Sequence, residues 1–153
     1  MEIEDVEITQ RDGHDLPLPS ERQYCLRRIL KANWSHWLKG KEIFTKMQET
    51  LYPYDGSPEL AYKQINEDVK FLNLCGRFDK MIIGNRSRGY KMATQEEFAT
   101  WFANRASEYN AAWDYAKAMA DNAKMDGQVI LNLWHQKDLR EFHDCFVPKK
   151  ANP

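Results

Sequence analysis

The spacing of apolar residues changes once along the central part of the chain, near residue 78, and this change constrains the fold more than any other feature. Before it, three segments repeat apolar residues every three or four positions, which predicts amphipathic helices over about 21–33, 41–51 and 58–74. After it, short apolar runs flank the polar, basic loop 84–89, which is typical of two strands joined in a hairpin. We therefore expect a mainly α-helical protein with a small β-hairpin.

Capping residues support these limits. Ser20 and Ser57 precede the first and third helices, and Pro58 suits the first helical position of the third. Thr94 begins a long helix that is expected to reach about residue 125, and a final helical segment is expected over 129–146. The chain is therefore divided into a mostly flexible acidic arm over 1–19, a domain over 20–94 and a helical extension over 95–153.

The net charge of −1 hides an uneven distribution. Residues 1–19 carry six acidic side chains and one basic side chain, whereas residues 20–95 carry fourteen basic and eight acidic side chains. The central segment therefore has a net charge of +6, and the C-terminal part, 96–153, has a net charge of −2. This surplus favours an anionic partner, although solvent-exposed helix faces often carry one too.

Membrane and secretory functions find no support in the sequence. No apolar run approaches the roughly 18 residues of a membrane span, and the first seven residues are too acidic for a signal peptide, so we expect a cytoplasmic protein. Three widely spaced cysteines predict reduced, buried thiols rather than disulfides. They are Cys25, Cys75 and Cys145.

Catalysis and metal binding are not expected either. His135, His143 and Cys145 lack the paired spacing of a zinc site. No phosphate-binding loop or nucleophile motif is present. The sequence predicts a protein that is not an enzyme and holds no metal or cofactor.

Three helices followed by a hairpin is the element order of a winged helix-turn-helix. Residues 60–76 read LAYKQINEDVKFLNLCG and resemble the recognition-helix pattern V-S-x-R-T-V-R-R-D-I-x-x-L-x-x-x-G. This pattern belongs to winged-helix transcription regulators of the deoxyribose-operon-repressor and biotin-repressor type. The matching positions are Leu60, Ile65, Asp68, Val69, Leu72 and Gly76, with Lys63 at the first arginine of the pattern.

Two further segments carry the same resemblance, which covers about 21–95. The run 88–93, RGYKMA, resembles the G-G-Y-x-L-A run of the second wing strand, and 39–43, KGKEI, resembles the T-G-x-E-L start of the second helix. The chain departs from the pattern at Asn66 and Glu67, which stand where the family has two arginines. Glu67 would repel a phosphate rather than bind it.

The resemblance implies binding to double-stranded DNA, and side-chain chemistry then assigns roles. Residues near the start of the third helix are candidate base readers, because amides read adenine bidentately: Lys63, Gln64 and Asn66. Six other cations would neutralise phosphates: Lys41, Lys46, Lys70, Arg86, Arg88 and Lys91. For each lysine, an ordinary position on a solvent-exposed helix surface is about as good an explanation as phosphate binding. Arg86 and Arg88 lie in a loop bounded by glycines and have no role in a core, so they are the stronger candidates.

The long helix after Thr94 carries an aromatic stripe that has two interpretations. Its residues are Phe98, Trp101, Phe102, Tyr109 and Trp113. They could cover the core of the chain, or they could pair with a second copy, because regulators that read two half-sites need a symmetric partner. We expect a homodimer built on this stripe.

Two functions therefore remain from the sequence. The first is a small winged-helix protein that binds double-stranded DNA and regulates transcription, with a compactness that suits a phage or another mobile element. The alternative is a winged-helix interaction module, an inhibitor or adaptor, that binds a protein partner through the acidic arm and the aromatic helices. A fold alone does not decide between them.

Overall fold

The computed structural model describes residues 3–122, so the segment expected to be helical over 129–146 lies outside the described residues, as do His135, His143 and Cys145. The chain divides into two compact units, Met1–Phe98 and Ala99–Pro153. The described part is mainly α-helical, as predicted, and has two small two-stranded antiparallel sheets, of which the sequence predicts the second.

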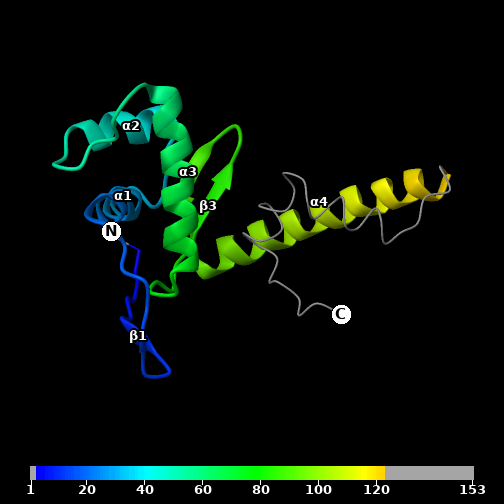
Figure 1. Cartoon of the computed structure of the whole chain (residues 1–153), viewed down its shortest axis with the longest axis horizontal. Coiled ribbons are helices and arrows are strands. Elements are labelled where there is room, and N and C mark those ends of the chain that lie inside the picture. Colours follow the sequence, from blue (N-terminus) through cyan, green and yellow to red (C-terminus); the bar gives the residue numbers. More distant parts are fainter. Residues whose placement is uncertain (1–2, 123–153) are drawn as a thin grey trace. The chain divides into compact units, whose positions relative to one another are not determined.

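Three helices of the first unit form where the sequence predicts them (Figure 1). They are α1 (Glu21–Ala32), α2 (Gly40–Gln48) and α3 (Pro58–Leu74). Ser20 and Ser57 cap α1 and α3, because each side chain accepts a hydrogen bond from a backbone amide in the first turn. Helix α2 ends earlier than expected, and Leu51 is 89% exposed instead of continuing its apolar face.

The predicted hairpin consists of β3 (Ile82–Asn85) and β4 (Gly89–Met92), which pair antiparallel. Leu38, in the connection between α1 and α2, adds to the free edge of β4 through two reciprocal backbone hydrogen bonds of 2.8 Å with Tyr90. Gly89 is required at this close approach. Its φ is +99°, and a Cβ atom there would lie 2.1 Å from the Leu38 carbonyl oxygen.

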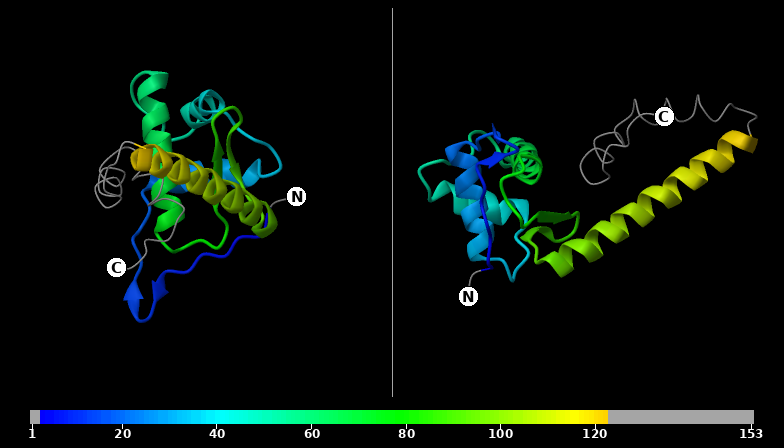
Figure 2. Two further views of the ribbon diagram at one scale, coloured as in Figure 1. Left: turned by 90° about the vertical axis from the view of Figure 1, so that its right-hand side faces the viewer. Right: turned by 90° about the horizontal axis from the view of Figure 1, so that it is seen from below.

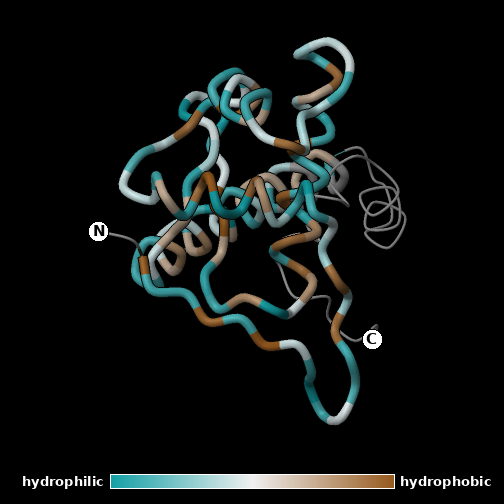
Figure 3. Tube along the Cα trace, turned by 90° about the vertical axis from the view of Figure 1, so that its left-hand side faces the viewer, coloured by the Kyte–Doolittle hydropathy of each residue, from teal (hydrophilic) through white to brown (hydrophobic). Residues whose placement is uncertain are grey.

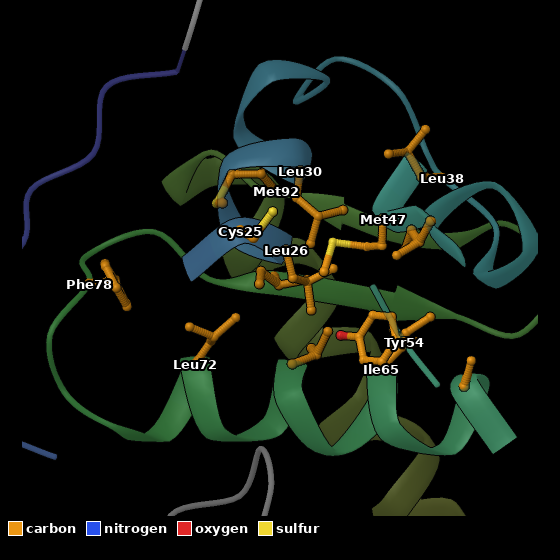
Figure 4. Close-up of a cluster of buried hydrophobic side chains, with 14 of the residues drawn as sticks. Cys25, Leu26, Leu30, Leu38, Met47, Tyr54, Ile65, Leu72, Phe78 and Met92 are labelled. Carbon is orange, nitrogen blue, oxygen red and sulfur yellow. The ribbon is translucent and has the colours of Figure 1, made fainter. Parts of the chain in front are cut away.

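The hydrophobic core lies between the three helices and the hairpin. Figure 4 shows Ile65 and Leu72 on one face of α3, directed toward Leu26 of α1 and Met47 of α2. These four side chains are at most 1% exposed. Cys25 and Cys75 are buried without a disulfide, as the sequence predicts for them.

Asp68 is a buried carboxylate on α3 that joins three parts of the first unit. Its oxygens accept hydrogen bonds from Arg22 at 2.9 and 3.1 Å and from Gln23 at 3.1 Å, both on α1. They also accept one at 2.7 Å from the Tyr54 hydroxyl, in the connection before α3. The aspartate of the recognition-helix pattern therefore has a structural role here, because it fixes α3 against α1.

The sequence predicts a mostly flexible arm over 1–19, whereas residues 3–19 make specific contacts with the rest of the unit. Their backbone exchanges hydrogen bonds with the α3–β3 connection, from the Ile8 amide to the Arg77 carbonyl and from the Asp79 amide to the Val6 carbonyl. A short hairpin follows, formed by β1 (Gln10–Arg11) and β2 (His14–Asp15). Figure 3 shows hydrophobic residues spaced along the segment that leads to its hydrophilic tip.

Two buried arginines hold this N-terminal segment. Arg27 on α1 pairs with Asp5 at 2.5 Å and stacks over the Phe78 ring at 3.9 Å, with both charged side chains at most 7% exposed. Arg77 donates hydrogen bonds to the carbonyls of Leu16 and Pro17. Asp5 and Glu7 near the N-terminus thus form ion pairs with the buried side chains of Arg27 and Arg77.

Helix α4 (Gln95–Asn122) begins at the predicted cap. The Thr94 hydroxyl accepts a hydrogen bond from the Glu97 amide, and the Glu97 side chain accepts one from the Thr94 amide. Trp101, Phe102 and Tyr109 of the aromatic stripe are half-buried. Dimerisation through the stripe, including Phe98 and Trp113, stays a prediction.

Candidate nucleic-acid interface

The start of α2, one edge of α3 and strand β4 meet at a single junction. The Tyr90 hydroxyl of β4 donates a hydrogen bond of 3.1 Å to the Asn66 side-chain oxygen of α3. The Tyr62 ring of α3 lies against Gly40, where an added Cβ would come within 2.9 Å of the ring. These contacts, with the Leu38–Tyr90 pairing, fix α3 relative to the hairpin.

Five of the nine predicted DNA-binding residues border this junction, and all are exposed. We call them the α3–hairpin surface: Lys41, Lys63, Asn66, Arg86 and Arg88. Within residues 3–122, none of the four cations takes part in an ion pair. Figure 2 shows the hairpin that carries the two arginines in two further views.

The hairpin loop is shaped by one side chain. The Asn85 side-chain oxygen accepts hydrogen bonds from the backbone amides of Ser87 and Arg88, at 2.9 and 3.2 Å. Such an Asx turn holds the loop without using either arginine side chain. Arg86 and Arg88 are therefore presented to solvent on a defined turn.

The other four predicted residues lie in different surroundings. Lys91 forms an ion pair with Glu97 at the start of α4. Lys46 lines an open groove of about 530 Å³ between α1 and the end of α2, together with Arg28. Lys70 lines a shallow cleft with Pro17, Glu67 and Leu74. It follows Lys63 by seven residues, so the helical period places both lysines on the outward face of α3. Lys46 thus lies in a different groove and Lys91 in an ion pair, whereas Lys70 stays on the face that carries Lys63.

Gln64, a candidate base reader, is half-buried. Its side-chain oxygen is buried and has no hydrogen-bond partner among the described residues. Because bidentate recognition of adenine needs the amide oxygen as well as the amide nitrogen, Gln64 does not offer that pair of groups in this conformation.

The outward face of α3 is mixed in character. The buried residues of the helix include Ala61, Ile65 and Leu72, so the helical period directs Lys63 and Glu67 toward solvent. Both are exposed, and Leu60 and Leu74 near the two ends of the helix are 59% and 57% exposed. The face therefore offers a cation and a carboxylate one turn apart.

Two titratable groups near the junction have shifted pKa values. Burial raises the pKa of the Tyr90 phenol, so this hydroxyl stays protonated as a hydrogen-bond donor. Burial also opposes ionisation of Glu97, but hydrogen bonds from Lys91 and Thr94 outweigh it and lower the Glu97 pKa below its usual 4.5. Lys91 is thereby engaged in a charged pair.

Sequence reasoning missed Tyr62 and Tyr90, which organise the junction without carrying charge. Tyr90 belongs to the RGYKMA run that resembles the second wing strand. Its hydrogen bond to Asn66 joins residues 24 positions apart, so no local sequence pattern predicts it.

No group of three or more potential metal ligands occurs within residues 3–122, and no helix there is long and apolar enough to span a membrane. No protein-family model, curated protein or solved structure matches the chain.

Proposed function

We propose that this protein is a winged-helix regulator of transcription that binds double-stranded DNA, with α3 as the recognition helix and the β3–β4 hairpin as the wing. One observation carries the proposal. The Tyr90–Asn66 hydrogen bond ties the hairpin to α3, so that the α3–hairpin surface holds four cations without ion pairs around one junction. The pairing of Leu38 with β4 further fixes the hairpin beside the start of α2.

The roles of the cations follow from their positions. Lys63 projects from the outward face of α3, which suits a helix lying in the major groove. Arg86 and Arg88 stand on the hairpin loop and Lys41 at the start of α2, where each can neutralise a backbone phosphate. Phosphate contacts from the two elements that border this edge of α3 would set the register of the helix against the bases.

The double variant Arg86→Ala plus Arg88→Ala tests this proposal. Anisotropy titrations of a labelled duplex should show weaker binding by a similar factor for every duplex sequence, because phosphate contacts carry no sequence information. The matched control is Arg28→Ala plus Lys31→Ala, which removes the same charge from α1. Equal losses in the two double variants would mean that only net charge matters, and the wing assignment would then be wrong.

A protein partner is the second candidate, and the exposed leucines favour it. Leu60, Leu74 and Leu18 are 59%, 57% and 71% exposed, and Glu67 stands among the cations of α3. Under this function, Arg86 and Arg88 would have no effect on duplex binding, because the chain would bind no duplex at low salt. The same titration therefore distinguishes the two functions.

A further inference from the structure

We infer that Glu67 is a base-reading residue and that Lys63 and Glu67 together select a G·C-containing site in the major groove. This inference rests on the proposed function, and it names the class of DNA sequence that the α3–hairpin surface would prefer. It assigns a DNA-binding role to Glu67, which stands where the recognition-helix pattern has an arginine.

The first step concerns the two side-chain amides on α3 and the hydrogen-bonding groups that they can present to a base. The Asn66 side-chain oxygen accepts the hydrogen bond from Tyr90, and the Gln64 side-chain oxygen is buried. Recognition of adenine by an amide uses its oxygen toward the N6 amino group and its nitrogen toward N7. Gln64 therefore does not present both groups to a base, and Asn66 could read adenine only by accepting a second hydrogen bond on the oxygen that Tyr90 already engages.

The second step is what remains on the outward face. Lys63 and Glu67 are exposed, four residues apart, and make no ion pair within residues 3–122. Four residues of α-helix rise about 6 Å, so the two side chains reach base pairs close together along one groove. One of them only donates hydrogen bonds, and the other only accepts them.

The third step matches these groups to the bases. Lysine donates to O6 and N7 of guanine, and a carboxylate accepts from the N4 amino group of cytosine. Adenine also presents an amino group, but its N7 acceptor lies beside that group and repels a carboxylate. Cytosine has no acceptor there, so Glu67 favours cytosine while Lys63 favours guanine.

The simplest rival explanation is that Glu67 only repels DNA. In that case, removing its charge would strengthen binding to every duplex by one factor. If Glu67 reads a base, removing it abolishes discrimination at one position. Glutamine should give a third result, because a glutamine side chain reads adenine bidentately. The preferred base at that position should then change from cytosine to adenine.

The experiment uses the full chain and a pool of randomised duplexes of one length, from which bound molecules are selected and sequenced. Anisotropy titrations then compare the selected duplex with copies in which each G·C pair is replaced by A·T. We expect replacement of the guanine that Lys63 reads, and of the cytosine that Glu67 reads, to weaken binding by the unaltered protein about tenfold or more each. Glu67→Ala should remove the penalty at the cytosine position alone, and Glu67→Gln should select A·T at that position.

Glu49→Ala is the matched control, because it removes one exposed carboxylate at the end of α2 and should keep the G·C preference. Circular dichroism verifies that each variant is folded. If Glu67→Ala tightens binding to all duplexes equally and no position of the selected duplex loses its G·C preference, the base-reading role of Glu67 is refuted while DNA binding stands. If the unaltered chain binds no duplex at about 50 mM salt, where phosphate contacts are strong, both the inference and the proposed function are refuted.

Discussion

Replacing Asp68 by alanine should destabilise the first unit strongly, because this carboxylate holds α3 against α1. The substitution removes the acceptor for Arg22, Gln23 and Tyr54 at once. Removing one partner of a buried ion pair costs about 3–5 kcal/mol. The Arg22 side chain is 38% exposed and regains water, which reduces that cost.

The Tyr54 hydroxyl sets a lower bound on the effect. Tyr54 is only 2% exposed, so its hydroxyl would be left buried without a partner, at a cost of about 1–3 kcal/mol. Together these contributions give a loss of roughly 3 kcal/mol in the free energy of unfolding. Tyr54→Phe should cost less, about 1 kcal/mol, because it removes the donor together with its need for a partner.

Urea denaturation followed by circular dichroism measures these losses, and the midpoint should fall while the m-value stays unchanged. Glu67→Ala is the control on the neighbouring position, where an exposed side chain should change stability by less than about 0.5 kcal/mol. If Asp68→Ala changed stability no more than Glu67→Ala, the structural role of the Asp68 network would be wrong.

Three further predictions follow from single features of the structure. Gly89→Ala should lower the free energy of unfolding by more than about 2 kcal/mol, because the new methyl group would collide with the Leu38 carbonyl. Gly13→Ala should lower it less in the same urea titration, because Gly13 has φ +77° but no atom within 4 Å of the added Cβ. Because the pKa of Glu97 is lowered in the folded state, its pairing with Lys91 stabilises the fold above pH 4.5, and this stabilisation is lost as the pH falls through the folded-state pKa. Glu97→Gln should therefore make the stability of the fold depend less on pH in this acidic range. Sedimentation should give a mass near twice 18.1 kDa, and Tyr109→Glu should give monomers, whereas a mass near 18.1 kDa for the unaltered chain would exclude the predicted dimer.

The sequence predicts the helices and the hairpin because their signals are local. The period of α3, its Ser57 cap and the following Pro58 reproduce the bounds Pro58–Leu74. The Thr94 cap likewise marks the start of α4. Each of these signals acts within one or two helical turns, so it survives in the linear order of residues.

The attachment of residues 3–19 and the direction of individual side chains could not be predicted in the same way. The Asp5–Arg27 pair joins positions 22 residues apart, and no period connects them. Gln64 is polar and is expected at the surface from the sequence, yet its side-chain oxygen is buried, whereas Asn66 on the other side of Ile65 is exposed. Tertiary packing, rather than residue type, decides which of the polar positions on α3 face solvent.

The salt dependence of duplex binding tests the central claim most directly. Each phosphate that a cation neutralises contributes about −0.9 to the slope of log K against log salt concentration. If Lys41, Arg86 and Arg88 each engage one phosphate, the slope per protomer should be about −3, and Arg86→Ala plus Arg88→Ala should reduce its size by about 2. A slope near zero, or a slope that the double variant leaves unchanged, would contradict DNA binding by this surface.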